Sequence, residues 1–257
     1  MKKSWVLVLL ADSSYVKWAF ETIQMARSIG EWKETIVLLC PEGLEQTSPW
    51  KELGDVFKVT WKPIPPRDQT ELWKYWQTAE RDYDYYYLAM RPNIFYKFYI
   101  FTDYFQQWDV VFYLDASCRI QGSLSRFQRV CEPSMCLYAH SNTYPSYEWK
   151  LSKEFVNPQT IPFPLERDYF QSTLLIYDTQ ILHSTIVDRL FELATLYTPK
   201  NDQGTMNLYF QFEVPIWKQI PLRDDQGWLY DFHERFNEAQ DQYVILKKPI
   251  AEMSVRR

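Results

Sequence analysis

Continuous apolar runs alternate with helically spaced apolar residues along this chain. The runs at 5–11, 35–40 and 56–61 predict buried strands, because a strand that is covered on both faces has no polar side. Between the first two runs, apolar residues recur at three- and four-residue steps and predict a helix over 15–30. The proline-rich segment 62–68 is expected to be a loop.

The same alternation continues to residue 211. It predicts a core-facing aromatic helix at 93–107, strands at 110–114, 135–139 and 172–177, and helices at 186–197 and 202–211. The polar, proline-punctuated stretch 140–167 is expected to be a long surface excursion, and loops of that length are usually functional.

This order of elements predicts an α/β fold with a mostly parallel central sheet and helices on both faces. A chain of 257 residues without an internal repeat or a convincing domain boundary suits a single domain over 1–257. In such a sheet, ligands bind in the crevice beyond the carboxyl ends of the strands. Asp12 and Asp115 both directly follow an apolar strand. Two carboxylates are therefore expected at the edge where a ligand binds.

Composition narrows the function classes. The formal net charge of −5 and the lack of a basic run argue against a nucleic-acid partner, because binding phosphates requires clustered Lys and Arg. No apolar stretch approaches the roughly 18 residues that a membrane-spanning helix needs. The aromatic content of 18% suits a protein that stacks on bases and sugar faces, and it suits an aromatic core equally well.

Several weaker signals bear on location. The four cysteines form no CxxC pair and have no partnering histidines, which favours reduced thiols in the cytoplasm over a zinc site. Lys2 and Lys3 before the first apolar run imitate a short signal peptide. That run leads directly into an amphipathic helix, as a first strand does, so a strand is favoured. The basic residues at 247–248 and 256–257 leave peripheral membrane attachment open.

Four segments, in order, resemble the GT-A glycosyltransferases, and within them the glycogenin and galactosyltransferase-like family 8. They are VLLADSSY at 8–15, KFYIFTDYFQQWDVVFYLDASCRIQGSL at 97–124, YFQSTLLIY at 169–177 and NDQGTMNLYF at 201–210. A looser match follows in ILKKP at 245–249. Each segment alone is weak evidence, but the order and the separations of all four agree with those of the family. The resemblance implies a GT-A (Rossmann-like) fold and transfer of a sugar from a nucleotide-sugar donor.

The implied activity is a retaining transfer from a UDP-sugar to a glycan or another hydroxyl acceptor. The rival is a catalytically inactive relative that binds nucleotide or glycan, and Ser117 favours it. The joint presence of Asp115, Asp202 and Gln203 favours the enzyme. A nucleotidyltransferase of similar architecture would need a glycine-rich, basic phosphate loop after the first strand, and residues 12–15 do not form one.

By the same resemblance, Ala11, Asp12 and Tyr15 bind the nucleotide base. Lys97 reaches the ribose or a phosphate of the donor, and Lys248 contacts the diphosphate. Two other interpretations stay open. The ring of Tyr15 also suits an aromatic staple at the start of the helix, and a lysine near the chain end is commonly just exposed.

Gln171, Asp202 and Gln203 are expected to line the sugar pocket. A retaining transfer needs a group on the sugar face opposite the leaving group, and the resemblance assigns that place to Gln203 or Asp202. Because a glutamine is a poor nucleophile, electrostatic support of a short-lived cation with front-side attack is the favoured mechanism. Asp202 is also expected to cap the helix that it precedes.

The resemblance further implies a divalent cation, Mn²⁺ or Mg²⁺, between the donor diphosphate and the carboxylates of a D-x-D motif. Here the motif is Asp115-Ala116-Ser117, so a serine replaces the second carboxylate. The family's C-terminal histidine has no clear counterpart, because the closing segment offers Gln242 and Lys247 instead. Asp115 and Ser117 are therefore expected to hold the ion appreciably only together with nucleotide.

Overall fold

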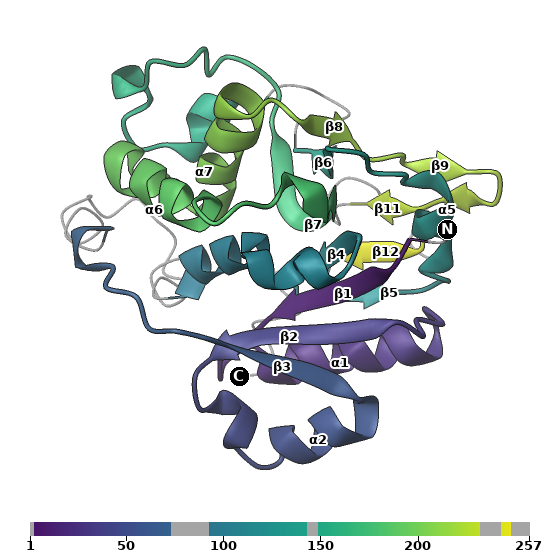
Figure 1. Ribbon diagram of the computed structural model, residues 1–257. Helices are drawn as coiled ribbons and strands as arrows, with labels where there is room; N and C mark the ends of the chain where they lie inside the picture. The colour runs from purple at the N-terminus through teal and green to yellow at the C-terminus, as the bar shows by residue number, and fades with distance from the viewer. Residues whose placement is uncertain (1–2, 73–92, 143–148, 232–242, 248–257) are drawn as a thin grey trace.

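The computed structural model describes residues 3–72, 93–142, 149–231 and 243–247. Its centre is a seven-stranded sheet with the order β3-β2-β1-β4-β7-β6-β8 (Figure 1). The strands are β1 Trp5–Leu10, β2 Thr35–Pro41, β3 Val59–Ile64, β4 Val110–Leu114, β6 Leu137–Ser141, β7 Phe170–Asp178 and β8 Trp217–Gln219. The α/β fold predicted from the sequence is confirmed.

One strand of this sheet, β7, runs against the others. The pairs β3/β2, β2/β1, β1/β4 and β6/β8 are parallel, whereas β7 is antiparallel to both β4 and β6. The sheet is therefore mostly parallel, as predicted. Because β1 and β4 are parallel neighbours, their carboxyl ends meet at one edge. That edge is where an α/β sheet binds ligands.

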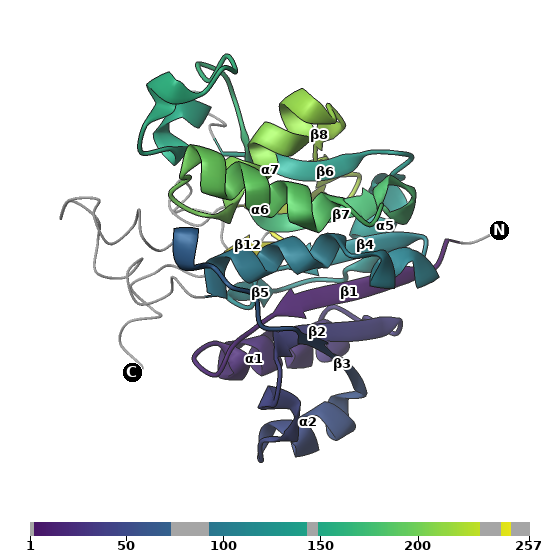
Figure 2. The same cartoon turned by 60° about the vertical axis from the view of Figure 1, so that its left-hand side comes forward.

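Burial on both faces explains the continuous apolar runs. In β1, Val6 and Val8 pack into one core, and Leu7 and Leu9 pack into the other, since alternate side chains of a strand point to opposite faces. The first core includes residues of α6 (Ile186–Tyr197) and α7 (Asp202–Leu208). The second includes residues of α1 (Val16–Ser28) and α5 (Ser125–Val130), with α2 (Trp50–Phe57) packed against it. Figure 2 shows α6 beside α7, and α1 with α2 away from them.

Short helical turns make most of the remaining connections. The 3-10 helices are η1 Leu44–Gln46, η2 Phe95–Phe101, η3 Asp103–Gln107, η4 Leu151–Glu154, η5 Pro158–Thr160 and η6 Thr179–Ile181. A π-helical turn, η7 Tyr209–Glu213, continues α7. None of the helices in the described ranges is long and apolar enough to cross a membrane.

A second, three-stranded sheet lies at the end of β4. It consists of β5 Cys118–Ile120, β11 Tyr230–Asp231 and β12 Ile245–Lys247, in the order β11-β12-β5. Lys247 lies opposite Cys118 in this sheet. Cys118 follows shortly after Asp115 along the chain. A separate hairpin joins β9 Arg223–Asp224 to β10 Gly227–Trp228. The small sheet thus brings a C-terminal lysine beside the turn that follows β4.

Two predicted elements have different bounds. The strand expected at 56–61 begins at Val59, because α2 extends to Phe57 and ends with Lys58 in the left-handed region. Helix α2 itself was missed, and the first part of the expected loop at 62–68 belongs to β3. The strand expected at 135–139 begins at Leu137, because Met135 has a positive φ of 50°.

Two other predictions are confirmed only in part. The segment 93–107 is helical and faces the core as expected, but from Phe95 onward it forms two 3-10 helices, η2 and η3, separated by the extended backbone of Thr102. Of the expected surface excursion at 140–167, residues 143–148 lie outside the described residues, and the rest is only partly on the surface. His140 ends up buried in β6, and Leu151 and Phe155 join the first core.

Candidate functional site

Asp115 lies directly beyond β4, at the carboxyl edge of the sheet. Its backbone N–H donates to the Thr173 carbonyl oxygen of β7 at 2.9 Å. Its carbonyl oxygen accepts from the Cys118 N–H at 3.0 Å and closes the turn into β5. The backbone on both sides of the carboxylate is therefore fixed where the strand ends.

Lys97 joins two carboxylates in the interior. Its Nζ lies 3.0 Å from Asp115 Oδ1 and 3.1 Å from Asp202 Oδ2. It also donates to the Ser172 hydroxyl at 3.1 Å. Lys97 comes from η2, and only 8% of the residue is exposed. Lys97, which interrupts an aromatic segment, thus holds the carboxyl end of β4 and the start of α7 together.

Lys247 approaches Asp115 from the other side. Its Nζ donates to Asp115 Oδ2 at 2.6 Å, and the Lys247 side chain is 16% exposed. Tyr113 also donates its hydroxyl to Asp115 Oδ1 at 2.8 Å. Both oxygens of the Asp115 carboxylate therefore have a cationic partner, Lys97 for one and Lys247 for the other.

These contacts determine the charge state of the cluster formed by Lys97, Asp115, Asp202 and Lys247. Burial alone would raise the pKa of Asp115, but Lys247 and Lys97 outweigh it and hold this pKa well below its ordinary value. Burial alone would lower the pKa of Lys97, but Asp115 and Asp202 outweigh it and raise this pKa above its ordinary value. Asp115 and Lys97 are therefore both charged at neutral pH.

Asp202 begins α7, and it does not cap that helix. Asn201 is the N-cap, and its side-chain oxygen accepts from the N–H groups of Gln203 at 2.9 Å and Gly204 at 3.3 Å. The Asp202 carboxylate, on a residue only 4% exposed, is directed to Lys97 instead. The expectation that Asp202 caps the helix is therefore wrong, and its carboxylate instead forms part of the charged cluster around Lys97.

Replacing Asn201 by alanine is expected to lower the free energy of unfolding by about 1 kcal/mol, because the α7 cap is lost. Asn201→Ser keeps an acceptor at the cap and should retain most of the stability. Urea unfolding of both variants measures the difference. Equal stability of Asn201→Ala and the parent protein would contradict the capping role.

Gln203 uses both ends of its amide within the protein. Its Oε1 accepts from the Ser172 N–H at 3.0 Å, and its Nε2 donates to Glu154 Oε1 at 3.3 Å. Burial raises the pKa of that Glu154 carboxyl. With both ends engaged, Gln203 connects α7 to β7 rather than pointing freely into a pocket.

Gln171 joins β7 to β11, and Asn207 adds a second contact between α7 and β7. Gln171 is 1% exposed, and its Oε1 accepts from the Tyr230 hydroxyl at 3.1 Å. The Asn207 side chain accepts from the Phe170 N–H at 2.9 Å and donates to the Phe170 carbonyl oxygen at 2.8 Å. Asn207 belongs to the 201–210 motif but received no role from the sequence. Its position in that motif was the available signal.

The residues expected to bind the base lie at the end of β1. The Ala11 N–H donates to the Leu39 carbonyl oxygen at 3.0 Å. The Asp12 carboxylate accepts from the N–H groups of Ser14 at 2.8 Å and Tyr15 at 3.1 Å, and from Asn93 Nδ2 at 2.6 Å. The partly buried ring of Tyr15 packs against the second core.

The structure thus gathers only some of the predicted site residues. Lys97, Asp115 and Asp202 are in direct contact, and Gln203 lies next to them along α7. Asp12 holds the turn that begins α1, without a contact to that cluster among the described residues. Lys248 lies outside the described residues. Lys247, which had no assigned role, is the C-terminal lysine that reaches Asp115.

The described residues fit a divalent cation poorly. No group of three or more His, Cys, Asp or Glu side chains suited to a metal occurs within the described ranges. Asp115 directs both carboxylate oxygens to lysines. Ser117, the other expected ligand, is neutral and 4% exposed. A cation at Asp115 would have to displace an ammonium group that already binds there.

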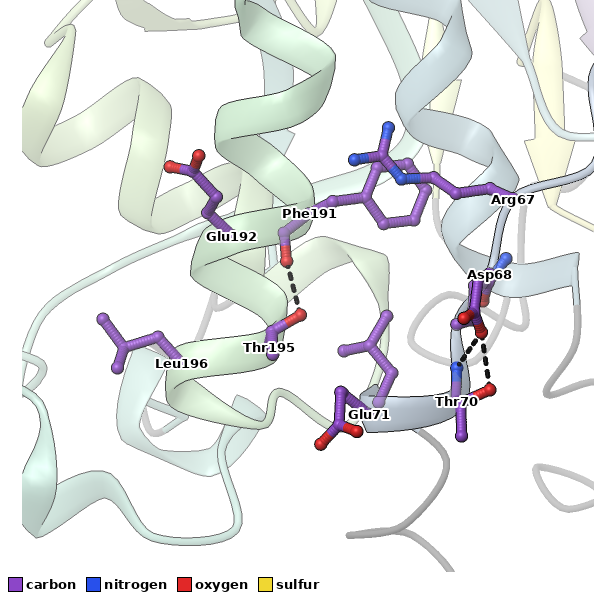
Figure 3. A pocket seen from close by; sticks show the side chains of 10 residues that line it. Arg67, Asp68, Thr70, Glu71, Phe191, Glu192, Thr195 and Leu196 are labelled. Atoms are coloured by element: carbon purple, nitrogen blue, oxygen red, sulfur yellow. Dashed lines mark hydrogen bonds between the residues drawn. The ribbon is translucent and has the colours of Figure 1, made fainter.

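A pocket of about 670 Å³ lies elsewhere, between α6 and the segment 67–72. None of the site residues predicted from the sequence lines it. Figure 3 shows the Arg67 guanidinium over the Phe191 ring, at 4.1 Å from the ring centre. Arg67 also forms an ion pair with Asp188 at 2.8 Å. The charge that Arg67 brings to this pocket is therefore already balanced.

Comparison with known proteins adds a fold assignment. The sequence matches no protein-family profile, and no curated protein matches it. Solved structures do match. The bifunctional glycosyltransferase WbbM is 12% identical with a TM-score of 0.58, over 96% of this chain and 46% of its own. The chain therefore spans less than half of the length of WbbM.

Two further structures match over most of both chains. The galactosyltransferase LgtC, in complex with donor and acceptor sugar analogues, is 12% identical with a TM-score of 0.56, over 94% of this chain and 86% of its own. Mouse xyloside xylosyltransferase 1 is 9% identical with a TM-score of 0.55, over 96% of this chain and 98% of its own. Together with the sheet order described above, these likenesses show that the chain has the fold of the GT-A glycosyltransferases.

Proposed function

We propose that this protein is a glycosyltransferase. It moves a sugar from a UDP-sugar to a hydroxyl group of a glycan or another acceptor, and it retains the anomeric configuration. The observation that carries the proposal is the charged cluster around Lys97, which pairs Asp115 with Asp202 at the carboxyl edge of the sheet. Fixed charges in a partly dehydrated site stabilise charge that develops during a reaction more strongly than the same charges in water.

Sugar transfer is supported by the proteins that share the fold. They include a galactosyltransferase, a xylosyltransferase and the mannosyltransferase Ktr4p from S. cerevisiae in complex with GDP. These proteins act with different sugars, so the fold does not choose the donor. UDP as the donor nucleotide rests on the motifs at 8–15 and 97–124.

In the proposed reaction, the bond between the anomeric carbon and the β-phosphate oxygen of the donor breaks, and its electron pair leaves with the phosphate. The acceptor hydroxyl oxygen bonds to the same carbon on the same face, and its proton passes to the released diphosphate. Asp202 stabilises the positive charge that develops on the sugar. Gln203, engaged by Ser172 and Glu154, is a positioning residue for this end of α7.

The test is release of nucleoside diphosphate from a panel of UDP-glucose, UDP-galactose, UDP-xylose and GDP-mannose, with and without sugar acceptors. We expect turnover with a UDP-sugar, and NMR of the product should show the anomeric configuration of the donor. An inverted product would overturn retention. Turnover with GDP-mannose alone would overturn the choice of UDP.

The second candidate is a catalytically inactive relative that binds a nucleotide or a glycan. Ser117 and the two lysines that engage Asp115 favour it, because they differ from a D-x-D motif that is free to take a metal. Saturable binding of UDP without release of UDP from any sugar nucleotide would establish this candidate in place of the enzyme.

Tyr15→Ala is expected to weaken UDP binding about tenfold, since stacking of a base on an aromatic ring contributes about 1–3 kcal/mol. Tyr15→Phe keeps the ring and should bind UDP nearly as well as the parent protein. Isothermal titration calorimetry measures both. Unchanged UDP affinity in Tyr15→Ala would leave the ring as a packing residue at the start of α1.

A further inference from the structure

The leaving group of the proposed reaction needs positive charge close to Asp115. As the sugar departs, negative charge grows on the diphosphate, and a fixed cation near those oxygens lowers the barrier. In this protein the Asp115 carboxylate holds an ammonium group, Lys247 Nζ at 2.6 Å, where a D-x-D carboxylate would hold a metal ion. Within the described ranges, no group of three or more His, Cys, Asp or Glu side chains could hold a metal ion instead.

We propose that Lys247 takes the place of the divalent cation, so that this protein binds the diphosphate of its donor without a metal ion. The inference rests on the proposed function. It assigns a binding role to a residue that the sequence motifs leave without one, and it competes directly with the expectation of Mn²⁺ or Mg²⁺ at Asp115 and Ser117.

The charges of the motif agree with this substitution. The charges of two carboxylates and a dication sum to zero. The charges of the Asp115 carboxylate and the Lys247 ammonium group also sum to zero. Ser117 supplies no charge. The loss of the second carboxylate and the exchange of a dication for a monocation therefore compensate each other. The diphosphate meets a site of the same total charge.

Lys247, not Lys97, has the freedom to bind phosphate. Lys97 Nζ lies within 3.1 Å of Asp115, Asp202 and Ser172, and an ammonium group has three protons to donate. Lys247 Nζ contacts Asp115 alone among the described residues, so two of its protons have no acceptor within those ranges. The Lys247 side chain is also the more exposed of the two, at 16% against 10%.

The fold holds Lys247 in place for this role. β12 pairs with β5, and β5 follows the turn that Asp115 begins. Asp115 Oδ1 accepts the Tyr113 hydroxyl and pairs with Lys97 Nζ. Asp115 Oδ2 is left to orient Lys247 Nζ. An ammonium group oriented in advance by a buried carboxylate loses less freedom when the phosphate binds.

The experiment is calorimetric titration of UDP into EDTA-treated protein, with and without added Mn²⁺. We expect nearly the same affinity in both conditions. If Mn²⁺ tightens UDP binding by about tenfold or more, which corresponds to about 1.4 kcal/mol, the inference is overturned and the proposed function stands. If UDP binds in neither condition, the proposed function fails as well.

Substitutions of Lys247 test whether this lysine binds the diphosphate of UDP. Lys247→Ala is expected to weaken UDP binding in EDTA by about tenfold or more, whereas Lys247→Arg should keep most of the affinity. Lys218→Ala removes an exposed lysine of β8 and serves as the matched control. Thermal unfolding shows whether each variant is folded. Unchanged UDP affinity in folded Lys247→Ala would overturn the inference.

A double variant keeps the test decisive if Lys247→Ala is poorly folded. Ser117→Asp combined with Lys247→Ala restores two carboxylates and removes the competing ammonium group. This variant is expected to bind UDP only when Mn²⁺ is present, the reverse of the parent protein. Metal-independent UDP binding by the double variant would contradict a phosphate-binding role for Lys247.

Discussion

Asp202→Asn is expected to lower kcat by about 10²- to 10³-fold, the usual cost of removing one preorganised electrostatic group from an active site. The amide keeps the shape of the side chain but loses the charge that pairs with Lys97 at 3.1 Å. UDP affinity should change little, because Asp115 and Lys247 remain and the proposed role of Asp202 concerns the sugar. Steady-state kinetics with a UDP-sugar and calorimetry with UDP separate the two effects.

The matched control for this variant is Asp55→Asn, which removes an exposed carboxylate from α2. Its kcat should equal that of the parent protein. A loss of UDP affinity in Asp202→Asn as large as the loss in kcat would place Asp202 beside the diphosphate instead of the sugar. An unchanged kcat would remove it from the catalytic site.

The strands of the sheet could be predicted because their burial is encoded locally. The bounds of β4 agree with the predicted strand at 110–114, and β1 ends within one residue of the prediction. In both strands nearly every side chain is buried, so the apolar run and the strand coincide. The segment at 93–107 lacked such a signal. Its three- and four-residue spacing suits either kind of helix, and nothing local marks the extended backbone at Thr102.

The site could be predicted only in part, for a related reason. The positions of Asp115 and Asp202 follow from a strand end and a helix start, which are local features. The contact of Lys247 with Asp115 depends on the pairing of two three-residue strands, β5 and β12, that are far apart in the sequence. The engagement of the Gln203 amide by Ser172 and Glu154 depends equally on tertiary packing. A motif names such residues but does not show which atoms remain free.

Lys97→Met is expected to lower the free energy of unfolding by about 3–5 kcal/mol, because removing one partner from a buried ion pair leaves the other charge uncompensated. Asp115 keeps Lys247, but Asp202 loses the cation that lies 3.1 Å away. For a chain of this size, such a loss corresponds to a drop in Tm of about 10 °C. Lys218→Met, on exposed β8, should unfold like the parent protein.

The double variant Lys97→Met with Asp202→Asn should be more stable than Lys97→Met alone, because it removes the carboxylate that was left without a partner. The pH dependence gives a second readout. In the parent protein, the lowered pKa of Asp115 contributes stability that is present above the unfolded pKa of about 3.9 and is lost as the pH falls further. Lys97→Met forfeits part of that contribution, so its stability deficit should shrink as the pH falls toward and below this value. A deficit that stays constant with pH, or a double variant less stable than the single one, would show that Lys97 acts through packing and not through its charge.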